Sequence, residues 1–305
     1  MTIAVTPFDG FCGFRPLQQI ASFLGHVPEL RSLVSDAEAD RFARAVSAGA
    51  DSSDPQVVSS NKAALKALFA ALMKAPEPRV QELTAALAAS ARASPATCGG
   101  PEYGGAQLAE LLLRLDAQFP RDIGLFCALF LNYVTLQPGE AIFLQANDPH
   151  AYLSGDVVEC MAASDNVVRA GLTPKFKDVE NLVDMLTYSY APIEAQKMKP
   201  VPWGKGSGNG TTILYDPPID EFAVVRTELP AGEAETFEPV QGPSVVLVTE
   251  GGGSISHLDT EGSGVGHKTE LLARAGLIFF VGATARLQMA AGPDGLVAFR
   301  AFCEL

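Results

Sequence analysis

The chain has 305 residues, enough for one or two domains with a large core. Hydrophobic residues make up 48% of it and charged residues 19%, which is typical of a folded globular protein and excludes extensive disorder. The formal net charge of −13 argues against nucleic acid or an anionic membrane as a partner, although a local cationic cluster could still bind a phosphorylated small molecule.

The five cysteines are scattered, odd in number and without a Cys-x-x-Cys spacing, so buried free thiols in a reducing compartment are expected. The N-terminus shows no basic region followed by an apolar stretch, and the apolar run over residues 126–134 is too short to cross a bilayer. The sequence therefore predicts a cytoplasmic protein.

Residues 2–6 are predicted to form a strand, and a strand at the very start of the chain suggests that a segment is missing upstream. A helical pattern follows from residue 15 to about 118, with apolar stripes at helical spacing over residues 17–24, 65–73, 80–87 and 108–115. Burial of each leucine contributes about 1.5–3 kcal/mol, so packing alone explains these stripes and no chemistry is assigned to them.

Local signals predict where these helices begin and end. Pro28 is expected to end the first helix, and Ser60 or Asn61 to open the helix of the second stripe. The Ala/Ser-rich stretch 85–97 and the Gly-rich stretch 98–105 are expected to join helices.

From residue 123 onward the pattern changes to strands. Residues 125–136 form an apolar run that predicts a strand covered on both faces, and Asp178 is expected to cap a short helix. Residues 192–212 are expected to form an exposed loop. Short strands separated by turns then predict a β-sandwich or jelly roll, with strands over residues 222–228, 244–249, 253–257, 276–281, 286–289 and 297–302.

The segment 145–161 predicts a tight hairpin whose pivot is the two-residue turn Gly155-Asp156. In that register Tyr152 lies opposite Glu159. Because side chains alternate along a strand, His150, Tyr152 and Glu159 share one face, whereas the other face is apolar. A polar trio on one face of an apolar hairpin indicates a pocket.

Several interpretations of these side chains remain open. His150 could ligate Zn²⁺, yet the sequence shows no clean spacing that supplies the two further protein ligands of a catalytic zinc site. Glu159 is either a general acid or base, or a structural carboxylate paired with Arg169. Arg169 and Lys175 could clamp a phosphate or stabilise an anionic intermediate, and the alternative is that they are ordinary surface cations.

Residues 149–175, which begin PHAYLSGDVVEC and end RAGLTPK, closely resemble the signature of the type I phosphomannose isomerase family. Residues 6–16 (TPFDGFCGFRP) and 299–303 (FRAFC) are similar to other segments of that family. The resemblance runs nearly along the whole chain, in order.

The resemblance implies a mainly β fold with an inserted α domain: cupin or jelly-roll β-sandwiches plus a helical domain. The expected organisation is a remnant strand of a first cupin over residues 1–14, a helical domain over 15–119 and a C-terminal cupin region over 120–305. The first cupin would be largely missing.

The resemblance also implies a zinc enzyme that interconverts mannose 6-phosphate and fructose 6-phosphate and feeds mannose activation towards GDP-mannose. His150 matches the family's last zinc ligand, and Arg169 matches its catalytic arginine. Glu159, Tyr152 and Lys175 match pocket positions, of which we assign Glu159 a catalytic role and the other two substrate binding. The full-length protein is expected to be a monomer that binds a phosphorylated hexose.

One departure from the family pattern is large. The family's other three zinc ligands, a Gln-x-His pair and the glutamate of a Lys-Pro-Glu segment, precede the position that Met1 matches. The resemblance thus implies that Met1 is internal to a longer protein and that this chain binds zinc weakly or not at all. The alternatives are a metal-free phosphosugar-binding cupin, an inactive truncated paralogue, and a structural partner subunit with a Glu159–Arg169 ion pair.

Overall fold

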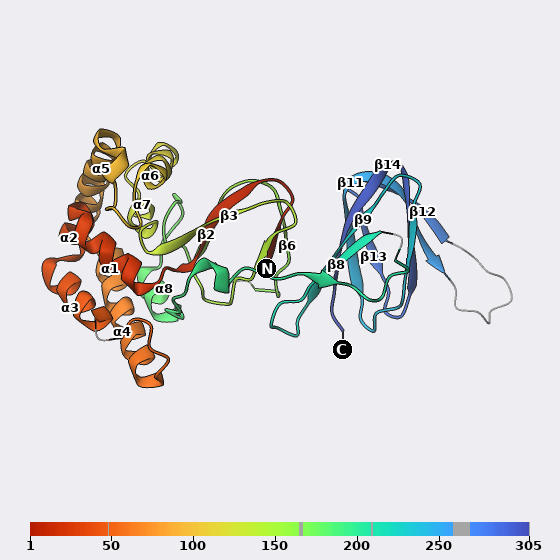
Figure 1. Cartoon of the computed structure of the whole chain (residues 1–305), viewed down its shortest axis with the longest axis horizontal. Coiled ribbons are helices and arrows are strands. Elements are labelled where there is room, and N and C mark those ends of the chain that lie inside the picture. Colours follow the sequence, from red (N-terminus) through yellow and green to blue (C-terminus); the bar gives the residue numbers. More distant parts are fainter. Residues whose placement is uncertain (48, 165–166, 209, 259–268, 305) are drawn as a thin grey trace.

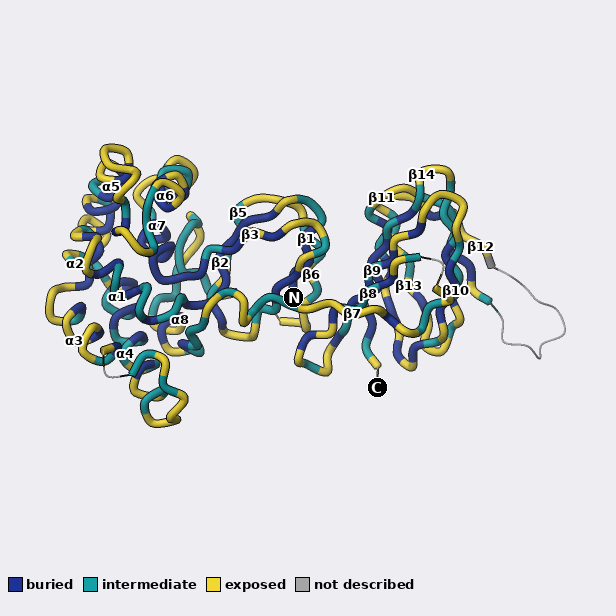
Figure 2. Tube along the Cα trace, viewed as in Figure 1, coloured by how far each residue is buried: buried dark blue, intermediate teal, exposed yellow. Residues whose placement is uncertain are grey.

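The computed structural model describes residues 1–47, 49–164, 167–208, 210–258 and 269–304. Three parts follow one another along the long axis of the molecule (Figure 1). Helices occupy one end, a small β part lies in the middle, and a larger β part occupies the other end. Buried segments run through all three parts (Figure 2).

The helical part packs its apolar stripes into the largest hydrophobic cluster among the described residues. Leu65, Leu68 and Leu72 are at most 1% exposed, as the stripe predicted. Its helices are α1 (Leu17–His26), α2 (Pro28–Val34), α3 (Asp36–Ser47), α4 (Pro55–Met73), α5 (Glu77–Ala93), α6 (Ala106–Gln118) and α7 (Gly124–Cys127), with a 3₁₀ turn at Pro95–Thr97.

Two helix boundaries differ from the predicted ones. Helix α4 begins at Pro55, because the Asp54 carboxylate accepts hydrogen bonds from the backbone of Gln56 at 2.8 Å and Val57 at 3.3 Å. The Ala/Ser-rich stretch is largely helix, since α5 runs to Ala93. Alanine has the highest helix propensity, so this composition favours a helix over a connector.

The apolar run 125–136 is only partly a strand. Its first residues belong to α7, and β3 begins at Leu131 (Leu131–Leu136). Helix α7 is fully buried, and so are four of the six residues of β3. A run that is apolar on all sides lacks the periodicity that separates a buried helix from a buried strand.

The middle part consists of two antiparallel three-stranded sheets. One has the order β4-β1-β6 and the other β3-β2-β5. The strands not yet given are β1 (Thr2–Ala4), β2 (Phe8–Phe14), β4 (Ala141–Ile142), β5 (His150–Ser154) and β6 (Val157–Glu159).

The predicted hairpin is wrong in its pairing although its turn is in place. Strand β5 pairs with β2 and β6 pairs with β1, so the turn at Gly155-Asp156 is a corner between two sheets. Gly155 has φ +98°, and a Cβ there would lie 2.6 Å from the Pro7 carbonyl oxygen. The Thr6 hydroxyl accepts a hydrogen bond from the Asp156 backbone at 2.8 Å, which ties this corner to the loop between β1 and β2.

The C-terminal part is an eight-stranded antiparallel arrangement in which β11 and β14 are much longer than predicted. Each joins two predicted strands, and bulges near Glu250 and Gly251 mark where the predicted break fell in β11. The sequence did not predict β7, β8, β10 or β12. The strands are β7 (Val201–Pro202), β8 (Thr211–Tyr215), β9 (Ala223–Leu229), β10 (Ala234–Phe237), β11 (Ser244–Leu258), β12 (Thr269–Arg274), β13 (Ile278–Val281) and β14 (Arg286–Phe302).

Strand pairing divides the β strands into two groups. Strands β3 to β6 pair with β1 and β2, whereas β7 to β14 form the separate C-terminal sheet. A shared apolar cluster containing Ile3, Tyr215 and Phe299 joins the two β parts. Along the chain, β6 and β7 are separated by α8 (Val179–Met185), which packs against the helical part, and by a 3₁₀ turn at Ile193–Ala195. Asp178 caps α8 as predicted.

The Asp178 cap and the combination of antiparallel sheets with an inserted helical part confirm the sequence predictions. All five cysteines are free thiols as expected, but only Cys12 and Cys127 are buried. Among the described residues, no helix is both long and apolar enough to span a bilayer.

A buried carboxylate connects the helical part to the middle part. Asp9 on β2 is 6% exposed and accepts hydrogen bonds from Arg114 on α6 and from the Tyr133 hydroxyl on β3, the latter at 2.7 Å. Burial acts to raise the pKa of Asp9, but the hydrogen bonds from Arg114 and Tyr133 outweigh it, so the pKa lies below its ordinary value of 3.8.

We predict that Arg114→Met lowers the free energy of unfolding at neutral pH by about 1–2 kcal/mol. The Asp9 carboxylate then stays buried without the hydrogen bond and positive charge of Arg114. The pair stabilises the fold above the ordinary pKa of 3.8, and this contribution is lost as the pH falls through the lowered folded value. Urea unfolding at neutral pH and near pH 3 should therefore show a difference that shrinks in acid. Lys66→Met, which breaks the exposed Lys66–Asp184 pair, serves as control and should change little. A loss of equal size at both pH values would contradict the prediction.

Candidate functional site

Tyr152 and Glu159 meet across the corner at Gly155-Asp156. The Tyr152 hydroxyl donates a hydrogen bond to Glu159 Oε1 at 2.5 Å and also hydrogen-bonds the Thr2 hydroxyl. The His150 ring lies 6.0 Å from the Tyr152 ring, centroid to centroid. The three predicted polar side chains thus gather on one exposed face, as the alternation along the strands predicted.

The strands of the first fourteen residues hold this face in place. In the two sheets, Thr2 pairs with Glu159, Gly10 with Tyr152, and Cys12 with His150. Gly10 cannot carry a side chain, because a Cβ would lie 2.7 Å from the Ala151 carbonyl oxygen. The close approach of β5 to β2 at position 10 therefore requires glycine.

The Tyr152 side chain is partly exposed and packs against an apolar ring. Its ring packs edge-on against Phe8, with the centroids 5.4 Å apart, and the residue is 37% exposed. Burial, followed by the hydrogen bond to the Glu159 carboxylate, raises the pKa of Tyr152 well above its ordinary range. The phenol therefore stays protonated at neutral pH and acts as a donor to the carboxylate.

The His150 ring has a defined tautomer. Its Nδ1 lies 3.0 Å from the Asp148 carbonyl oxygen, which can only accept a hydrogen bond. Nδ1 must therefore carry the proton when the ring is neutral, and Nε2 carries the free lone pair. This is the state in which an imidazole can ligate a metal or accept a proton.

The opposite face of the same strands is apolar, as predicted, and divides between two cores. Ala151 and Leu153 pack against the helical cluster, whereas Val158 and Cys160 pack against the cluster that joins the two β parts. The corner thus lies between the two ends of the molecule, held by apolar contacts on both sides.

Arg169 and Lys175 lie on the segment between β6 and α8. Arg169 is half-buried and Lys175 is exposed. Within the described part of the chain, neither side chain makes a hydrogen bond or ion pair with Glu159. The structural alternative for Glu159, an ion pair with Arg169, is therefore absent, since the carboxylate hydrogen-bonds Tyr152 instead.

The described residues do not form a zinc site. Nowhere among them do three histidine, cysteine, aspartate or glutamate side chains gather as a metal would require. A catalytic zinc needs about three protein ligands, and His150 offers one imidazole. The residues present thus do not fit a zinc ion by themselves.

Sequence reasoning missed two residues of this region. Thr2 contacts the Tyr152 phenol across 150 positions of sequence, and Asp148 orients His150 through its backbone carbonyl. No local motif marks Thr2, because its role arises from strand pairing. The residue before Pro149 is a common turn position, and this signal could have indicated Asp148.

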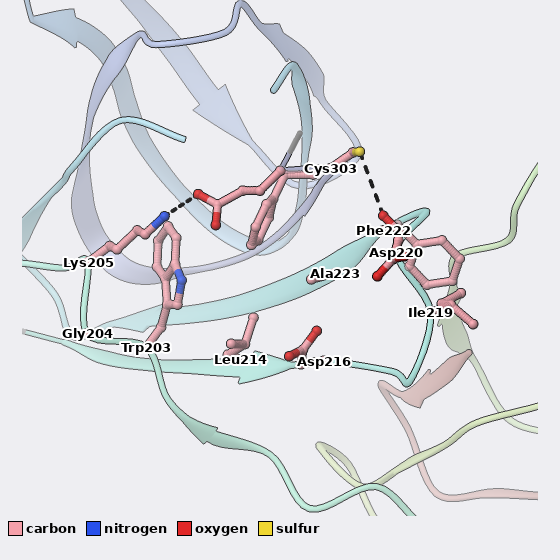
Figure 3. Close-up of a pocket in the computed structure, with 12 residues that line it drawn as sticks. Trp203, Gly204, Lys205, Leu214, Asp216, Ile219, Asp220, Phe222, Ala223 and Cys303 are labelled. Atoms are coloured by element: carbon pink, nitrogen blue, oxygen red, sulfur yellow. Dashed lines mark hydrogen bonds and ion pairs between the residues drawn. The ribbon is translucent and has the colours of Figure 1, made fainter. Parts of the chain in front are cut away.

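A pocket of about 700 Å³ lies elsewhere, in the C-terminal β part (Figure 3). Trp203, Leu214 and Phe302 line it together with Asp216, and a Lys205–Glu304 ion pair lies beside them. None of the five predicted site residues lines this pocket, so it is not the predicted site.

Comparison with protein families finds two matches along the chain. The helical insertion domain of type I phosphomannose isomerase matches residues 33–131, and the C-terminal domain of the same family matches residues 212–257. These matches cover α3 to α7 and most of the stretch from β8 to β11.

Individual relatives match over the full length of the chain. The mannose-6-phosphate isomerase of Aspergillus fumigatus is 48% identical over 321 residues, covering 100% of this chain and 68% of that protein. The Saccharomyces cerevisiae mannose-6-phosphate isomerase is 44% identical over 306 residues, with the same coverage of both. The chain thus spans about two thirds of the length of these relatives.

Solved structures agree with this likeness. Mannose 6-phosphate isomerase from Salmonella typhimurium, bound to its substrate fructose 6-phosphate and to zinc, is 27% identical with a TM-score of 0.72. It is matched over 100% of this chain and 66% of that chain, and a variant of the same enzyme gives a TM-score of 0.74. The fold expected from the resemblance, cupin-type sheets with an inserted helical domain, is confirmed. This chain belongs to the type I phosphomannose isomerase family, a family of isomerase enzymes.

Proposed function

We propose that this protein interconverts mannose 6-phosphate and fructose 6-phosphate. The exposed His150–Tyr152–Glu159 face supports this proposal, together with the full-chain likeness to named isomerases. In such a reaction a base takes the proton from C2 of the aldose and returns it to C1, while the proton of the C2 hydroxyl passes to the oxygen on C1. The formula does not change, so no external oxidant or reductant is needed.

Glu159 is the carboxylate that we propose for proton transfer. It is exposed, and the Tyr152 hydroxyl holds one of its oxygens while the other makes no hydrogen bond within the described residues. A carboxylate oriented in this way has a free oxygen that can accept a substrate proton. Tyr152 then has two roles: it orients Glu159 and, in our proposal, contacts the substrate.

Arg169 and Lys175 are the cations that we propose for the negative charges of the reaction. Arg169 would stabilise the enediolate that forms between the two proton transfers, and Lys175 would bind the phosphate. Neither side chain has a hydrogen-bond or ion-pair partner within the described residues, so both are available to an anion. We further propose that the product feeds mannose activation in the cytoplasm and that the enzyme is a monomer.

For zinc, the proposal concerns only one ligand. His150 is suited to be one ligand, with Nε2 free, but the described residues supply no set of three. We therefore derive no step of the reaction from the metal and propose only that His150 would contribute to a zinc site completed by other ligands.

We predict that Arg169→Ala lowers kcat for mannose 6-phosphate isomerisation by about 100-fold or more, because one stabilising donor of a developing anion is typically worth 10²–10³ in rate. KM should change far less. Coupled assay of fructose 6-phosphate formation gives both constants, with Arg286→Ala on the far β part as the matched control. Turnover that survives Arg169→Ala would remove this residue from the mechanism.

We predict that the 305-residue chain retains well under about 0.5 zinc per molecule after dialysis, because a single imidazole binds zinc weakly. Elemental analysis of the purified chain measures this, and His150→Ala should reduce the residual zinc further, unlike His26→Ala. Full zinc occupancy that His150→Ala leaves intact would show that a different site holds the metal.

A metal-free phosphosugar-binding protein is the second candidate function, favoured by the missing ligand set within the described residues. The isomerase and the binding protein can be distinguished by titrating the protein with mannose 6-phosphate and following the ³¹P line width of the sugar phosphate. Binding without turnover, even with added zinc, would support the binding protein.

A further inference from the structure

The segment that follows Arg169 is fastened to the helical part by one carboxylate. Asp122, whose side chain is 12% exposed, accepts two backbone hydrogen bonds at Oδ1: from Gly124 at 2.7 Å and from Leu172 at 2.7 Å. Its Oδ2 accepts a third from Lys177 Nζ at 3.1 Å. A single residue thus connects the start of α7, the segment after Arg169 and a lysine before α8.

Two glycines allow the backbones to touch at this point. A Cβ on Gly171 would lie 2.8 Å from the Gly124 Cα, and a Cβ on Gly124 would lie 2.5 Å from Leu172 Cδ2. Real side chains do not approach so closely, so a larger residue at 171 requires a backbone shift and one at 124 requires Leu172 to move. The two segments can therefore make this contact only where Gly124 faces Gly171.

Alternate side chains of this segment pack into the helical core. Val168, Ala170 and Leu172 all lie against the helical cluster. Arg169, which lies between the first two of these residues, is half-buried and has no hydrogen-bond or ion-pair partner among the described residues. Leu172 has φ +54°, an unusual value for leucine, and its N–H is the group that Asp122 holds.

The same contact distinguishes the two lysines of the segment. Lys177 is engaged by Asp122 in an ion pair, whereas Lys175 makes no ion pair within the described residues. Only Lys175 is then free to bind a phosphate.

We propose that Asp122 is a positioning residue for Arg169. It fixes the backbone three residues after the guanidinium, so that Arg169 is presented to the substrate rather than to the helical core. This inference rests on the proposed role of Arg169 in the isomerisation. Asp122 itself touches neither substrate nor reacting atoms.

The first test is a kinetic double-mutant cycle with Asp122→Ala, Arg169→Ala and the double variant. We expect Asp122→Ala to lower kcat by about 10- to 100-fold with a smaller change in KM, as a misplaced catalytic group does. On the Arg169→Ala background it should lower kcat less than about threefold, because the group it positions is gone. Asp122→Asn, whose amide oxygen can still accept the Gly124 and Leu172 hydrogen bonds, should retain more activity than Asp122→Ala. Asp184→Ala, which removes an exposed carboxylate of α8, is the matched control.

The second test does not depend on activity. Amide hydrogen exchange should become faster over residues 168–177 in Asp122→Ala, with the Leu172 amide most affected, while exchange in α4 and α6 stays unchanged. Additive kinetic effects in the cycle, or unchanged exchange over 168–177, would overturn the positioning role. Absence of isomerisation in the parent protein would instead count against the proposed function, and the exchange result would then decide the Asp122 contact alone.

Discussion

The corner at Gly155-Asp156 is the constraint on which the candidate site depends. It directs β5 into one sheet and β6 into another. Tyr152 and Glu159 therefore meet across the corner, although their strands are not hydrogen-bonded to each other. Only glycine fits at position 155, both for its φ of +98° and for its contact with Pro7. Because the corner is also bonded to Thr6, the strands of the first fourteen residues and the polar face form one unit.

The rest of the molecule supports this unit from both ends. On one side Asp9 bonds to Arg114 of α6, and on the other the cluster around Ile3 and Phe299 packs the middle part against the C-terminal sheet. The segment carrying Arg169 belongs to the helical side, where apolar contacts and Asp122 hold it. In our proposal the helical part does more than stabilise the fold, since it sets the position of Arg169, the cation that we propose for the reaction.

Sequence alone predicted features encoded by nearby residues. Three such features are confirmed: the helical stripe at Leu65 and Leu68, the Asp178 cap and the turn at Gly155. Each depends only on residues that are close together in the sequence. The pairing of β5 and β6 was wrong, because their partners lie near residues 2–14 and no local pattern records a contact across 150 positions. Alternation alone still placed Tyr152 and Glu159 on one face. Thr2 and Asp122 were missed for the same reason as the pairing, and the roles of the five predicted site residues stay predictions.

The contact between Tyr152 and Glu159 is tested most directly by a double-mutant cycle in stability, with Tyr152→Phe, Glu159→Ala and the double variant measured by urea unfolding. A phenol that donates to a partly exposed carboxylate should give a coupling free energy of about 0.5–1.5 kcal/mol. Two single effects that add to the double effect within about 0.3 kcal/mol would mean that the two side chains do not meet, and the site described around this corner would then be wrong.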